Sequence, residues 1–119
     1  MATPTVLTPK PLADPAQLGT SASTLYTVPA STTTQVTSII LVNDSATPDA
    51  ATIYLVPSGG SAADTNILCK AFSVPADGLP YEIVSVNTQG IYLETGATIQ
   101  GLAVTANTIT YHLSGVELA

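Results

Sequence analysis

Positive charge is almost absent from this chain, and the shortage excludes several classes of protein. Its 119 residues contain two cations, Lys10 and Lys70, against eight carboxylates, for a formal net charge of −6. Nucleic-acid-binding proteins carry basic patches that neutralise phosphates, so we expect no nucleic-acid partner. Charged residues are only 8% of the chain. So few charged residues cannot cover the exposed faces of a coiled coil or a helical bundle.

Targeting and membrane signals are also lacking. The first four residues, Met1-Ala2-Thr3-Pro4, have neither the basic nor the apolar region of a secretion signal. The longest apolar run, Ile39-Ile40-Leu41-Val42, is far shorter than the roughly 20 residues that span a bilayer. We therefore expect no signal peptide and no membrane partner.

The side chains that usually carry chemistry are few. Cys69 and His112 are the only cysteine and the only histidine. They cannot supply the ligands of a zinc site within one chain, and a single cysteine forms no intrachain disulfide. No nucleophile elbow or comparable motif accompanies them. We interpret Cys69 as a small buried side chain and His112 as an outward residue of the last strand, and we expect no enzyme, no metal and no cofactor.

Four aspartates lie in expected loops, where two interpretations stay open. Loop carboxylates suit a hard cation such as calcium, and they also cap turns by accepting hydrogen bonds from nearby amides. No EF-hand spacing is present, so we favour turn capping for Asp44, Asp49, Asp64 and Asp77.

Hydroxyl and β-branched side chains replace the missing charge, and they favour strands. The chain has 10 serines and 19 threonines, and 45% of it is hydrophobic. Short alternating runs separated by turn residues predict strands at 24–28, 34–43, 51–56, 66–72, 80–86, 90–94, 97–105 and 108–114. The run 39–42 predicts a central strand buried on both faces. Such spacing is typical of an antiparallel β-sandwich, of which the jelly roll is one form.

The first part of the chain differs from the rest. Pro4, Pro9, Pro11 and Pro15, four of the nine prolines, lie within the first nineteen residues. Because proline lacks an amide donor, we expect this stretch to stay outside the sheets. The sequence thus predicts an extended arm over 1–22 and a sandwich domain over 23–119. The arm is expected to bind a partner through Val6, Leu7, Pro9, Lys10, Pro11, Leu12, Pro15 and Leu18.

Several segments of the sandwich resemble small structural proteins of tailed-bacteriophage virions. They are Leu25-Tyr26-Thr27-Val28-Pro29-Ala30-Ser31-Thr32-Thr33, Val36-Thr37-Ser38-Ile39 with Asn43, Ile53-Tyr54-Leu55-Val56-Pro57-Ser58-Gly59-Gly60, Gly96-Ala97-Thr98-Ile99-Gln100 and Tyr111-His112-Leu113-Ser114-Gly115-Val116-Glu117. The resemblance implies a virion structural protein that is made in the host cytoplasm. Decoration, or cement, proteins of the capsid surface are the type we expect.

The expected partners follow from this interpretation. They are the major capsid protein or another virion protein, and further copies of the chain. The chain has few charged residues with which to guard its sheet edges, and this favours a homo-oligomer. The resemblance implies a homotrimer. Two alternatives remain open: a tail or fibre-attachment component, and a carbohydrate-binding module that uses exposed tyrosines and loop aspartates.

Overall fold

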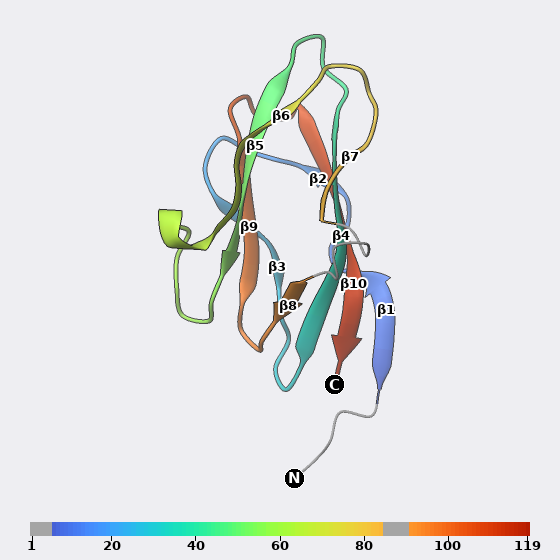
Figure 1. Cartoon of the computed structure of the whole chain (residues 1–119), viewed down its shortest axis with the longest axis vertical. Coiled ribbons are helices and arrows are strands. Elements are labelled where there is room, and N and C mark those ends of the chain that lie inside the picture. The colour runs from blue at the N-terminus through green and yellow to red at the C-terminus, as the bar shows by residue number, and fades with distance from the viewer. Residues whose placement is uncertain (1–5, 85–90) are drawn as a thin grey trace.

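Two antiparallel sheets, sheet A and sheet B, pack face to face in the computed structural model, which describes residues 6–84 and 91–119 (Figure 1). Sheet A consists of β1 (Leu7–Pro11), β2 (Ala16–Gln17), β4 (Thr33–Asn43), β7 (Tyr81–Val84), β8 (Ile91–Leu93) and β10 (Ile109–Leu118). Sheet B consists of β3 (Ser23–Thr27), β5 (Asp49–Val56), β6 (Ile67–Val74) and β9 (Thr98–Ala103). A single turn of 3₁₀ helix, η1 (Asp64–Asn66), precedes β6. The all-β antiparallel sandwich is therefore confirmed.

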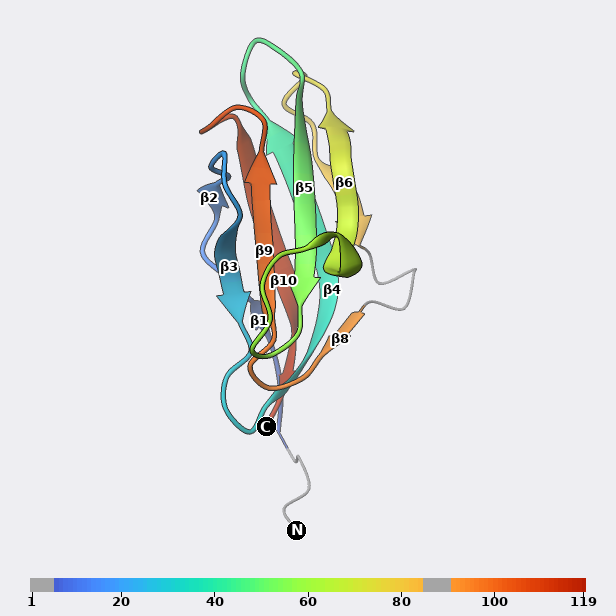
Figure 2. The same cartoon turned by 90° about the vertical axis from the view of Figure 1, so that its left-hand side faces the viewer.

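The strand order places two long strands at the centre of sheet A. β10 pairs with β4, while β1 and β2 lie one after the other along the far edge of β10. β7 and β8 share the opposite edge of β4. Sheet B has the order β3-β9-β5-β6 (Figure 2). Each of the eight expected strands overlaps an observed one. Parts of two, 80–86 and 90–94, lie outside the described residues.

The core lies between the sheets and is made of the alternate residues of each strand whose side chains point inward. In β10, Ile109, Tyr111 and Leu113 are buried, whereas His112 and Ser114 are exposed. This alternation is the pattern that the sequence predicts for a strand with one solvated face. The completely buried side chains include Leu18, Ile39, Leu41, Ile53, Ile99 and Ile109.

One expectation about β4 is wrong. Ile39 and Leu41 are fully buried, but Ile40 and Val42 are only half-buried. They point to the outer side of sheet A, which no other layer covers in the part of the chain that the structure describes. β4 is central within its sheet, yet it has one partly solvated face.

The prediction of a separate N-terminal arm is also wrong for the described residues from Val6 onward. β1 pairs with β10 from Leu7↔Leu118 to Pro11↔Ser114. Leu12 and Leu18 belong to the hydrophobic core, with exposed fractions of 7% and 0%. These residues form an edge of the sandwich, and the described chain displays neither a free arm nor a jelly-roll winding. Residues 1–5, with Pro4, lie outside the described residues.

Candidate functional site

The alternation of β1 explains how its prolines enter the sheet. Val6 exchanges backbone hydrogen bonds with Ala119, and the Leu12 amide donates to the Leu113 carbonyl at 2.9 Å. Even-numbered residues therefore direct their amides toward β10. Pro9 and Pro11 are odd-numbered, so the positions without a donor lie on the outward edge, where no partner strand needs one.

The residues expected to bind a partner separate into three groups. Val6 and Leu7 are exposed at 56% and 66%, and Pro9, Pro11 and Pro15 are exposed too. Lys10 forms an ion pair with Glu117 at 3.3 Å. The third group, Leu12 and Leu18, is buried in the chain's own core and has no surface left for a partner.

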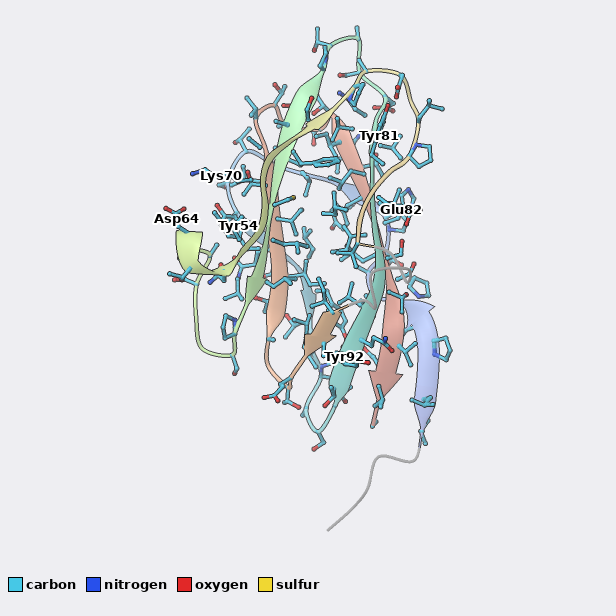
Figure 3. All side chains as sticks on the ribbon, viewed as in Figure 1. Tyr54, Asp64, Lys70, Tyr81, Glu82 and Tyr92 are labelled. Atoms are coloured by element: carbon cyan, nitrogen blue, oxygen red, sulfur yellow. The ribbon has the colours of Figure 1, made fainter. Side chains whose placement is uncertain are left out.

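An uncharged row of side chains crosses the outer side of sheet A near this edge. Cross-strand pairing aligns Tyr92 with Gln35, Gln35 with Val116 and Val116 with Pro9. Leu7 pairs with Leu118 in the next outward row of β1 and β10. We call this surface the β1–β8 face, made of Leu7, Pro9, Gln35, Tyr92, Val116 and Leu118. It holds no charged residue, and Tyr92 is 68% exposed on it (Figure 3).

Behind this face, a polar cluster ties the two sheets together. The Tyr26 hydroxyl, from β3, donates to Glu117 Oε2 at 2.5 Å and lies 2.7 Å from the Thr34 hydroxyl. Burial, together with the bond to Glu117, raises the pKa of Tyr26 to about 12. Lys10 reaches the other oxygen of the same carboxylate. The cluster therefore joins β1, β3, β4 and β10, and its residues are occupied with one another.

A pocket of about 360 Å³ opens beside β8, between the two sheets. We call it the β8 pocket. On one side are Ile91–Thr95 with Ala97, and on the other are the end of β5 and the turn after it, Leu55–Ser58. The pocket exists because β6 pairs with β5 only as far as Tyr54↔Ile67 and leaves the last residues of β5 uncovered. Figure 2 shows β8 below the start of β6 on the same side of the molecule.

Cys69 and His112 lie in different sheets, in β6 and β10. Cys69 is half-buried in β6 opposite Ile53, and burial raises the pKa of its thiol, which disfavours the nucleophilic thiolate. His112 is exposed on the outer side of β10, as expected. His112 lies opposite Ile40 of β4, an apolar side chain that neither donates nor accepts protons.

Two loop aspartates cap turns. Asp49 accepts hydrogen bonds from the Thr108 hydroxyl at 2.5 Å and from the Thr105 amide at 3.1 Å, which fixes the turn before β10. Asp77 accepts from the Leu79 amide and from the Tyr81 hydroxyl. Asp44 and Asp64 are exposed. Within residues 6–84 and 91–119, no three His, Cys, Asp or Glu side chains gather as a metal site.

The five tyrosines do not form a common surface. Tyr26 and Tyr111 are buried, and Tyr81 is half-buried in β7. Tyr54 lies toward the outer side of sheet B, and Tyr92 is on sheet A (Figure 3). The sequence did not predict the pocket, because contact between β8 and the end of β5 depends on how the sheets stack.

Comparison with protein-family models, with curated proteins and with solved structures found no match to this chain. No helix in the described part of the chain is long and apolar enough to cross a membrane.

Proposed function

We propose that the chain is a non-catalytic structural protein of a tailed-bacteriophage virion, a decoration or cement protein that binds and stabilises the outer shell. The proposal rests on one structural observation, the uncharged and partly apolar β1–β8 face. Exposed apolar surface of this kind marks interaction sites on otherwise soluble domains. The sequence resemblance to virion proteins supplies the biological setting.

The physical properties of the face suit repeated attachment to a regular shell. Burying one apolar side chain of the size of Leu7 yields roughly 1.5–3 kcal/mol before ordering costs, so a single copy binds weakly. Several copies held together, as in the homotrimer that the resemblance implies, add their contacts through avidity. The partner is the major capsid protein or another virion protein.

The N-terminal segment contributes to this attachment in a different way from a free arm. Leu7, Pro9 and Pro11 are exposed on β1, whose geometry is already fixed by pairing with β10. A preformed surface loses less conformational entropy on binding than a flexible arm does. Leu12 and Leu18 contribute by holding this segment on the sandwich.

A tail or fibre-attachment component is the second candidate, since the same face would serve there. A carbohydrate-binding module fits less well, because sugar sites group aromatic side chains and here only Tyr92 of the five tyrosines is exposed.

The test is the stoichiometry of this chain in purified particles, measured by quantitative mass spectrometry against the major shell protein. A decoration protein is present in a copy number of the same order as the shell protein. A number comparable to that of tail proteins identifies the second candidate, and absence from the particles overturns the proposal.

A further inference from the structure

The outer edge of β8 has no partner strand among the described residues. β8 pairs with β4 through Ile91↔Val36, Tyr92↔Gln35 and Leu93↔Thr34, and with no other described strand. In an antiparallel pair, alternate residues direct their amide and carbonyl groups away from the partner. β8 therefore presents backbone groups that can pair with one more strand.

The outer edges of β1, β6 and β3 carry features that discourage such pairing. The β1 edge has Pro9 and Pro11 on its outward side. β6 carries the exposed Lys70 and two register shifts in its pairing with β5, and β3 has a shift between Thr24 and Tyr26. Prolines, lysines and bulges are common protections against strand addition. The three residues of β8 include no proline and no charged residue, and their pairing with β4 has no register shift.

The β8 pocket gives this edge a place for side chains. Its volume of about 360 Å³ is at the small end of the range for ligand sites, which suits one or two apolar side chains. Leu55, Ile91 and Ala97 contribute apolar walls. A strand added at β8 would direct every second side chain toward one face, so alternate apolar residues would reach the pocket.

Charge identifies the kind of segment that fits. Among the described residues that line the pocket, Glu94 is the only charged one, and it is exposed. A second copy of this chain is a poor occupant of this edge, since it offers only two cations, Lys10 and Lys70, to pair with Glu94. Its two cations are also placed elsewhere, Lys10 on Glu117 and Lys70 on β6. A complementary segment is therefore basic and comes from another protein.

We propose that β8 and its pocket bind an extended segment of another protein, which adds to sheet A as a strand with apolar side chains in the pocket and a lysine or arginine beside Glu94. Main-chain hydrogen bonds supply affinity in this mode of recognition, and the pocket and the charge supply selectivity. This site shares Tyr92 with the β1–β8 face but uses the open backbone edge of β8, and the proposal holds whether or not the chain is part of a virion.

The test uses a random display library of peptides of about ten residues, long enough for one strand, selected against the purified full-length chain. We expect enriched peptides that alternate apolar residues with lysine or arginine. Affinities are then measured for Glu94→Lys, with Glu82→Lys on β7 as a control of identical charge change on an exposed strand residue away from the pocket. Glu94→Lys should weaken binding by about fivefold or more, because a favourable ion pair becomes a repulsive one, and Glu82→Lys should leave it unchanged.

A second measurement tests the backbone pairing itself. N-methylation removes a peptide's amide donors. Methylating alternate residues in one register should abolish binding, while methylating the intervening residues should leave it nearly intact. The proposal is overturned if no peptide is enriched, if Glu94→Lys and Glu82→Lys bind equally, or if both methylated registers bind as the parent peptide does.

Discussion

At the scale of single residues, Tyr26 illustrates how a charge-poor chain uses its few polar groups. Its hydroxyl contacts Thr34 and Glu117, which belong to the opposite sheet. One side chain thereby links β3 to β4 and β10 across the two sheets.

We expect Tyr26→Phe to lower the free energy of unfolding by about 1–3 kcal/mol, because Thr34 and Glu117 lose a partner in a partly buried site. Tyr92→Phe is the matched control, since Tyr92 is exposed, and should stay within about 0.5 kcal/mol. Urea denaturation measures both. The raised pKa also predicts that this contribution, complete below the ordinary tyrosine value of 10.0, disappears as the pH rises from there through about 12. Equal stability of the two variants would contradict the role of the cluster.

Asp49 makes the stability of the fold sensitive to acidic pH. Burial opposes its ionisation, but the hydrogen bonds from Thr108 and from the amides of Ala50, Thr105 and Val104 outweigh burial and lower its pKa below 3.8. Its contribution is therefore complete above that ordinary value and disappears as the pH falls below it, through the folded-state pKa.

Asp49→Asn should cost about 1–3 kcal/mol at neutral pH, since the amide cannot accept all of these bonds. Asp64→Asn, at an exposed position in η1, is the control. Thermal melts of both variants at neutral and acidic pH measure the effect. If Asp49→Asn matches the wild type at neutral pH, the carboxylate does not stabilise this turn.

At the scale of elements, β1 shows where sequence reasoning succeeds and where it fails. Alternation located the ends of β4 and β10 to within four residues, since each strand has one clearly apolar face. β1 and β2 were missed because Pro9 and Pro11 were interpreted as strand breakers. Their spacing of two residues contains the missing information, since it places both prolines on one edge of an extended strand. The pocket beside β8 was beyond prediction, because it depends on how far β6 extends along β5.

The edge position of the prolines predicts that they prevent association. Replacing both with threonine (Pro9→Thr and Pro11→Thr) supplies outward amides and should produce aggregates that grow with concentration. Light scattering at matched concentrations measures this. The same double substitution at two exposed loop prolines, Pro48 and Pro57, serves as the control. A Pro9/Pro11 variant that scatters no more than the wild type would show that its edge needs no protection.

Deleting the first nineteen residues tests whether the segment is structural. The deletion removes β1, β2 and two core leucines, so the remaining chain should melt many degrees lower or fail to fold. Leu18→Ala isolates the contribution of one buried leucine and should lower the free energy of unfolding by about 2–5 kcal/mol. Leu7→Ala, at an exposed position, should lower it little. A truncated chain that melts within a few degrees of the full chain would restore the interpretation of a free arm.

At the scale of the whole molecule, the distribution of charge and apolar surface argues for a binding protein. Cys69 and His112 lie in different sheets. The β1–β8 face, in contrast, gathers uncharged residues from β1, β4, β8 and β10. Sedimentation at micromolar concentration should detect the homo-oligomer that we propose, and a 12.1 kDa species alone would count against it.

The central claim is that the β1–β8 face attaches this chain to particles, and the most direct test is re-addition to particles stripped of it. Leu7→Asp places a charge on the face, and Val104→Asp places the same charge at a residue of similar exposure, 70% against 66%, outside the face. The quantity measured is the amount of each variant that sediments with the particles. We expect Leu7→Asp to bind at least about tenfold more weakly than the wild type, since each copy in a cluster carries the charge, and Val104→Asp to bind normally. Equal binding of the two variants would contradict the account.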